Sequence, residues 1–402
     1  MLAGLEGREI RRRTRHADPG RAGARPRPDL PAGTDLLPQI RHIVVLMMEN
    51  HSYDNYLGML TGRGEGFPLG PDGAPAAGNP RADGTVVQAH RLASTTQVPH
   101  VPIQSWHAAH LQWNGGLNDG FVRSVQATVP GTPAVNDELP MGYWTERDLP
   151  FYYGLARTFP VADRWFCSCL GPTFPNRRFL LAGTAHGLID DLPFGMADYP
   201  PNGTVFDMLT SHGIAWRNYH HVSSLSVVVK RALGGGGLAG LRRLASLGRW
   251  FPPLVTAERG NKTFTADLYP FGLARCLLHL RSVDRFFAEA DAGTLPAFSL
   301  VDPDFIRFSE ENPQDISKGE SYAAEVINRV MHGKGWPQTL LIWLYDEHGG
   351  YFDHVPPPEA VPPDDVPGKS LLAMPPWARA LLKPLFPKYL ASIANLDAGP
   401  VR

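Results

Sequence analysis

The sequence predicts a single α/β domain with a largely parallel central sheet and helices on both faces. Three short apolar runs support this prediction, at residues 43–48, 298–301 and 339–345. The run at residues 43–48 is uninterrupted, as is typical of a strand that is covered on both faces. Between the last two runs, residues 322–331 carry apolar side chains at helical spacing, as a helix packed on a sheet does.

Composition narrows the class of protein further. The 402 residues are 43% hydrophobic, which is enough for a large buried core in one folded unit. The net charge at pH 7 is −1, and a chain that binds nucleic acid through its phosphates needs a clear basic excess. We therefore expect no nucleic-acid partner.

Residues 1–38 differ from the rest of the chain. They are rich in Arg, Pro and Gly and show no periodicity, so we expect a disordered basic leader followed by one domain at residues 39–402. Adjacent arginines resemble a twin-arginine export signal, but the apolar stretch of a signal peptide is missing. No apolar run reaches the length of a transmembrane helix. The default expectation is a cytoplasmic protein, and an extracytoplasmic location stays open.

Two segments are expected to be insertions. Residues 62–100 are rich in Gly, Pro and Ala and predict a long surface excursion. Residues 223–250 contain a basic, apolar-patterned stretch that predicts one amphipathic helix. Transient contact with a membrane surface is one interpretation of this helix, and packing on the body of the protein is the favoured one.

Acids follow the first and the last predicted strands directly. Glu49 and Asn50 end the first apolar run, and Asp346 and Glu347 end the last. Parallel strands end at the same rim of a sheet, so four oxygen donors would converge there. Their charges favour a bound divalent cation such as Mg²⁺, Ca²⁺ or Mn²⁺, with Zn²⁺ less typical of an all-oxygen set. The alternative is that these side chains cap helices or anchor loops.

A hydroxyl and a guanidinium lie in a proline-rich segment at residues 171–177. Thr173 would be a nucleophile if a bound cation lowered the pKa of its hydroxyl, and otherwise an ordinary helix cap. Arg177 would hold a phosphate oxygen or, equally well, form a structural ion pair.

Several histidines are candidate site residues. His107 and His110 lie one helical turn apart. His354 follows the Gly349-Gly350 turn, which can fold it back toward the acids at residues 346–347. His220 and His221 are weaker candidates, and their roles stay open.

These segments together resemble the bacterial phosphoesterase family that contains phospholipases C and an acid phosphatase, within the alkaline phosphatase-like superfamily. The matching motifs cover residues 43–58, 118–121, 141–143, 171–177 and 345–358. They occur in the right order over residues 38–360 and are long enough to be specific.

The resemblance implies one divalent metal ion, whose identity stays open, with five ligands: Glu49, Asn50, Thr173, Asp346 and Glu347. It also implies that Thr173 is the nucleophile and that His107 and His354 face the phosphoryl group. Asn312-Pro313 departs from the family, which often has His-Pro there. The chain also reaches Arg402 without the closing strand and helix expected of the family, so we expect a C-terminally truncated domain.

The expected function is metal-dependent hydrolysis of a small phosphate ester or a phospholipid, with His354 protonating the leaving group. An alternative is a truncated, inactive homologue that acts as a binding protein or has no function. A third interpretation is a sulfatase or phosphonate hydrolase, but the extra metal ligands that such an enzyme needs are not evident in the sequence. The substrate and the oligomeric state stay open.

Overall fold

The computed structural model describes residues 27, 29–31, 33–98, 104–126, 136–189, 191, 199–221, 268, 277–305 and 307–368. Most of the predicted leader lies outside the described residues. The same holds for the predicted amphipathic helix in residues 238–250 and for residues 369–402.

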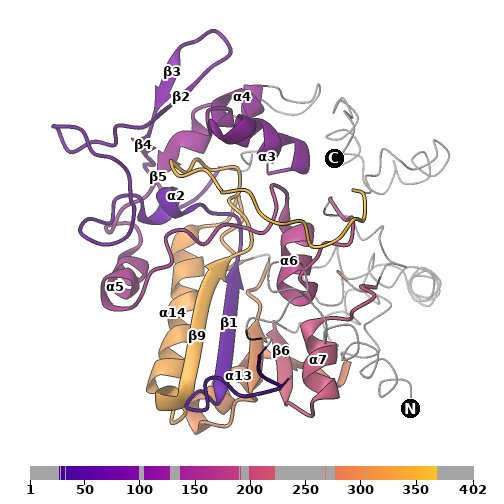
Figure 1. Cartoon of the computed structure of the whole chain (residues 1–402). Helices are drawn as coiled ribbons and strands as arrows, with labels where there is room; N and C mark the ends of the chain where they lie inside the picture. Colours follow the sequence, from indigo (N-terminus) through magenta and orange to yellow (C-terminus); the bar gives the residue numbers. More distant parts are fainter. Residues whose placement is uncertain are drawn as a thin grey trace, which may run out of the picture.

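A five-stranded sheet forms the centre of the protein (Figure 1). Every neighbouring pair in it is parallel, which confirms the predicted sheet. Across the sheet the strands are β7 (Leu280–Ser282), β6 (Trp216–His220), β8 (Phe298–Val301), β1 (His42–Met48) and β9 (Thr339–Tyr345).

Helices cover both faces of the sheet. The side chains of β1 accordingly alternate between two hydrophobic cores, one on each face. Val44 and Leu46 belong to one core, and Val45 belongs to the other. The first core is built with α5 (Pro150–Thr158), α13 (Val283–Ala292) and α14 (Ile316–His332). The second is built with α6 (Thr173–Ala182) and α7 (Val205–Ser211). The predicted α/β architecture is therefore confirmed.

Smaller elements gather beyond one end of the sheet (Figure 1). Several of them contribute to a third core that includes Phe67, Val87, Phe121 and Phe352, so part of the predicted surface excursion is buried. These elements are α2 (Tyr53–Leu57), β2 (Gly78–Pro80), β3 (Val86–Gln88), β4 (His90–Arg91), α3 (Trp106–Trp113), η2 (Asn114–Gly116), α4 (Phe121–Gln126), η3 (Leu139–Met141) and β5 (Gly142–Tyr143). The remaining short helices are η5 (Leu277–His279) and η6 (Trp336–Gln338).

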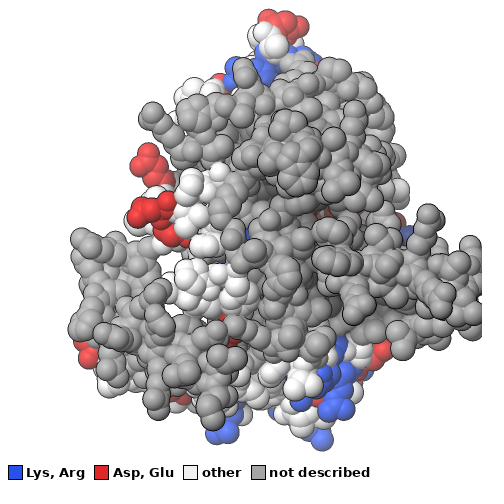
Figure 2. All heavy atoms as spheres, turned by 90° about the vertical axis from the view of Figure 1, so that its right-hand side faces the viewer, with Lys and Arg blue, Asp and Glu red and all other residues white. Residues whose placement is uncertain are grey.

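The charged side chains that are visible on one face occur in small groups of both signs (Figure 2). This distribution agrees with a net charge near zero. Within the described part of the chain, no helix is long and apolar enough to cross a membrane.

A buried carboxyl group ties the sheet to the elements at its end. Glu310 accepts hydrogen bonds from the hydroxyls of Tyr152 (2.6 Å), Tyr345 (2.5 Å) and Tyr56 (3.2 Å). Its backbone oxygen lies 3.0 Å from Nε2 of His51, just beyond β1. Burial raises the pKa of Glu310 to about 8, because desolvation outweighs the three hydroxyl donors.

This pKa predicts a pH dependence of stability. Between the ordinary glutamate value of 4.5 and about 8, the folded chain holds a proton on Glu310 that the unfolded chain has lost. The contribution of this group to stability therefore falls as pH rises through that window, by at most about 1.4 kcal/mol per unit. Glu310→Gln should make the urea-unfolding free energy decline less steeply between pH 5 and 8 than in the wild type. Equal slopes in the two proteins would contradict the assignment.

Candidate active site

The two predicted acid-bearing loops lie at the same rim of the sheet. β1 and β9 are neighbours, and Met48 pairs with Tyr345 at their ends. The next residues are therefore adjacent, and the backbone N–H of Asn50 donates to Oδ1 of Asp346 at 3.4 Å. The four side chains at these strand ends are buried: Glu49, Asn50, Asp346 and Glu347.

The loops stay together beyond this first contact. A Cβ on Gly349 would lie 1.9 Å from the carbonyl oxygen of Asn50, and Gly349 has φ +67°. Only glycine therefore permits so close an approach. Ser52 Oγ donates to the carbonyl of Phe352 at 2.7 Å. The segment after the Gly349-Gly350 turn thus folds back along the loop that follows β1, as the sequence suggested.

Arg177 forms ion pairs with acidic side chains at this rim of the sheet. From α6, its Nε donates to Oδ2 of Asp346 at 3.0 Å, and its Nη1 donates to Oδ1 of Asp302 at 3.2 Å. Its Nη2 is 3.8 Å from Oε1 of Glu49. Of the two interpretations that the sequence left open, this geometry favours the buried ion pair over contact with a substrate phosphate.

Negative charge and unpaired oxygens gather around Glu347. Burial raises its pKa well above the usual range, and the charges of Asp346, Asp191 and Glu49 act in the same direction. Oε1 of Glu347 and Oδ1 of Asn50 are buried without a hydrogen-bond partner among the described residues. A buried oxygen without a partner costs free energy, so these donors fit a bound cation.

Thr173 is the first residue of helix α6. The N-cap is Pro172, which makes no side-chain capping hydrogen bond, and the backbone N–H of Phe174 donates to Oδ1 of Asp191 at 2.8 Å. Thr173 is four residues before Arg177, so the two side chains share one face of the helix, the face from which Arg177 contacts Asp346. The prolines on either side of Thr173 suit the first turn of a helix, where a missing N–H costs nothing. The helix N-terminus also favours an anion beside it.

Two predicted histidines sit on segments next to these loops. His107 is half-buried in the first turn of α3. A Cβ on Gly171, two residues before Thr173, would lie 2.9 Å from the neighbouring Trp106 ring, so this turn packs beside the start of α6. His220 ends β6 at the same rim, where burial lowers its pKa by more than the charge of Asp302 raises it.

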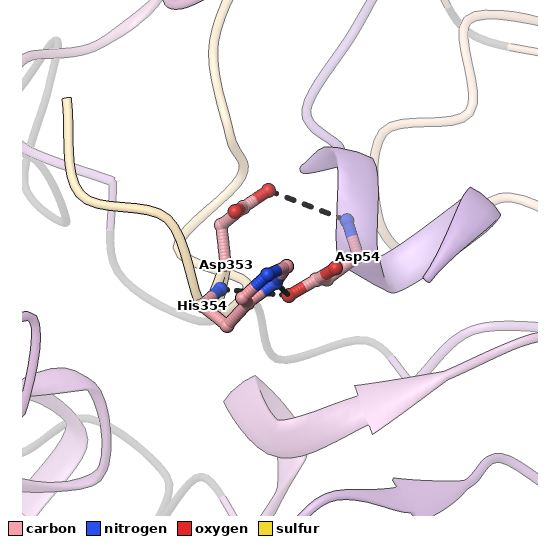
Figure 3. Close-up of side chains that lie close together, drawn as sticks. All are labelled: Asp54, Asp353 and His354. Carbon is pink, nitrogen blue, oxygen red and sulfur yellow. Dashed lines mark hydrogen bonds and ion pairs between the residues drawn. The ribbon is translucent and has the colours of Figure 1, made fainter. Parts of the chain in front are cut away.

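His354 contacts a residue that the sequence did not single out. Its Nδ1 lies 2.7 Å from Oδ2 of Asp54 in α2 (Figure 3). Potential ligand atoms of Asp54, Asp353 and His354 all lie within 4.8 Å of one another. Among the described residues, the carboxylates of Glu49 and its predicted co-ligands do not form so compact a group.

Sequence reasoning missed three carboxylates near the site: Asp54, Asp191 and Asp302. Asp302 follows β8 as Glu49 follows β1, so its place at a strand end was a usable signal. No apolar run precedes the other two, and tertiary contacts alone place them.

A parallel sheet whose adjacent strand ends carry acids, with a hydroxyl-bearing helix start beside them, defines an α/β protein consistent with the alkaline phosphatase-like phosphoesterases. Sequence comparison identifies the particular family. The model of the Phosphoesterase family matches residues 40–392, and the chain belongs to this family.

Phospholipases C are among its relatives. The chain is 31% identical over 350 residues to phospholipase C A of Mycobacterium tuberculosis, covering 81% of this chain and 61% of that protein. It is 32% identical over 361 residues to phospholipase C B of the same organism, covering 83% and 63%. It is 30% identical over 348 residues to the non-hemolytic phospholipase C of Pseudomonas aeruginosa, covering 81% and 44%. The matched part of the chain thus spans between 44% and 63% of these relatives.

The close approach between the loops predicts the effect of one substitution. Gly349→Ala should lower the free energy of unfolding by roughly 2–3 kcal/mol, because it adds a clash with Asn50 to the strain of a positive φ. The control is Gly84→Ala, where φ is +86° but nothing lies within 4 Å of the new Cβ. Gly84→Ala should lower the free energy of unfolding by only about 1 kcal/mol. Urea unfolding of both variants measures the difference, and equal losses would refute the contact.

Proposed function

We propose that this chain hydrolyses phosphate esters at the rim formed by β1 and β9. One observation carries the proposal: two buried loops that lie about 300 residues apart in sequence converge there, with unpartnered oxygens beside the start of α6. Family membership supports the same class of reaction. The proposed ligands of one divalent cation are Glu49, Asn50, Thr173, Asp346 and Glu347.

When bound, the cation would offset charge on the phosphoryl oxygens and lower the pKa of a nearby hydroxyl. The chain itself supplies the nucleophile. Thr173 Oγ attacks phosphorus in line, its proton passes to solvent water, and the P–O bond to the leaving alcohol breaks. Water then cleaves the phosphothreonine and restores the hydroxyl. The N-terminus of α6 favours the anionic group beside Thr173.

Arg177 has a supporting role in this scheme. Its guanidinium lowers the pKa values of Asp346 and Asp302 against the larger opposing effect of burial, and its ion pairs hold both side chains in place. Removing one partner of such a buried pair leaves an uncompensated charge and costs about 3–5 kcal/mol. We therefore place Arg177 among the residues that hold the site together rather than among those that touch the substrate.

Histidines supply the proton that the leaving group needs. His354 is proposed to protonate the departing oxygen, and His107 to face the phosphoryl group from α3. Hydrolysis of this kind needs a proton donor because an alkoxide is a poor leaving group. Two contacts support these roles: Ser52 in the loop after β1 donates to Phe352, near His354, and Gly171 packs against Trp106, next to His107.

The proposed substrate is a small phosphate ester or a phospholipid. The relatives named phospholipase C favour the phospholipid, and a phospholipid substrate would bring the protein into transient contact with a membrane surface. No observation favours the alternative of an inactive homologue, because all five proposed ligands are present and four of them lie at one rim.

Thr173 gives the direct test. Thr173→Ala should reduce turnover of a chromogenic phosphodiester by at least about a thousandfold with little change in melting temperature. Thr173→Ser should keep part of the activity because it retains the attacking oxygen. Each protein is assayed with Mg²⁺, Ca²⁺, Mn²⁺ and Zn²⁺ in turn.

The matched control is Thr204→Ala. Thr204 caps α7 through a reciprocal capping box with Asp207, so its loss should cost about 1 kcal/mol of stability and spare turnover. If Thr173→Ala behaves like Thr204→Ala, with reduced stability and retained turnover, Thr173 is not the nucleophile.

A further inference from the structure

Asp54 and His354 form a partly buried acid–imidazole pair (Figure 3). The Asp54 side chain is fully buried. Its Oδ2 accepts a hydrogen bond from the backbone N–H of His354 at 2.7 Å and lies 2.7 Å from Nδ1 of the same residue. One carboxylate oxygen therefore fixes both the backbone and the ring of His354.

The neighbouring Asp353 completes a reciprocal arrangement. Its Oδ2 accepts from the backbone N–H of Asp54 at 3.3 Å, and its Oδ1 accepts from the backbone N–H of Val355 at 2.9 Å. Asp54 thus contacts both the backbone and the ring of His354 and donates one hydrogen bond to Asp353. With the hydrogen bond from Ser52 to Phe352, these contacts keep His354 beside the loop that carries Glu49 and Asn50.

The charges around the ring favour the protonated imidazole. Asp54 from α2 contributes most, Asp353 and Glu65 act in the same direction, and burial opposes them, with a net rise in the pKa of His354. Glu65 is itself paired with Arg164 at 2.6 Å, so its effect is smaller. The Phe67 ring lies 6.3 Å away and carries no charge.

We infer that Asp54 is a positioning residue that acts through His354. This inference rests on the proposed phosphoesterase function. If the Asp54 carboxylate accepts a hydrogen bond from Nδ1–H, Nε2 is the nitrogen that exchanges a proton with the substrate. In the first step the Nε2–H bond breaks and an O–H bond forms on the leaving alcohol. In the second step the attacking water gives its proton back to Nε2. The proton on Nδ1 stays with the pair throughout.

The same three side chains also lie close enough together to bind a metal. The direct contact between Nδ1 and Asp54 favours the acid–imidazole pair, because a metal held by Nδ1 would displace that proton. Metal binding here is therefore an outcome that would overturn the inference.

The test combines Asp54→Asn, His354→Gln and the double variant. Asparagine can still accept a hydrogen bond from the backbone N–H of His354, but it lacks the negative charge that stabilises the protonated imidazole. Each single variant should lower kcat by about a hundredfold. The double variant should be little worse than His354→Gln alone, because Asp54 acts through the histidine. Asp54→Asn should also move the alkaline limb of the kcat/KM profile to lower pH.

A second readout does not need turnover. In ¹⁵N-histidine-labelled protein, the NMR signals that His354→Gln removes report the tautomer and pKa of His354. The inference predicts an Nδ1–H tautomer and a fall in this pKa in Asp54→Asn. Three outcomes would overturn it: an Nε2–H tautomer, additive losses in the double variant, or a metal equivalent that both single variants lose. An inactive wild type with the predicted NMR behaviour would instead refute the proposed function, and with it the proposal that Asp54 positions a proton donor for that reaction.

Discussion

The parallel register between β1 and β9 is the constraint on which the rest of this structure depends. With Met48 opposite Tyr345, both strands end at one level, and the polar residues that follow must share one buried space. The contact of Gly349 with Asn50 and the hydrogen bond from Ser52 to Phe352 continue that register into the loops. A shift of one residue would turn every side chain of β9 to the opposite face and separate the acids.

Bringing these acids together is costly, and the surrounding residues show how the cost is offset. Arg177 supplies a positive charge to Asp346 and Asp302, and the N–H of Phe174 at the start of α6 donates to Asp191. These contacts leave Oε1 of Glu347 unpartnered among the described residues. The arrangement is thus one in which protein groups stabilise the site only in part, as expected where a ligand completes it.

Much of this arrangement could be predicted from the sequence, and the remainder depends on tertiary contacts. β1, β8 and β9 were predictable because strands covered on both faces leave continuous apolar runs. β6 was not, because its run Trp-Arg-Asn-Tyr-His is polar, and its buried Asn218 donates to the carbonyl oxygen of Leu300 in β8 and to Oδ2 of Asp302 just after that strand. Asp54 meets His354 across 300 positions, a contact that no local pattern contains.

The most direct test of this account is where a divalent cation binds. Crystals of the full chain grown with Mn²⁺ should show an anomalous scattering peak between the β1 and β9 loops, within about 2.0–2.6 Å of ligand oxygens. Those oxygens should come from Glu49, Asn50, Thr173, Asp346 and Glu347. A peak at Asp54, Asp353 and His354 alone, or no peak at the rim at saturating Mn²⁺, would contradict the proposal that the two loops form a single metal site.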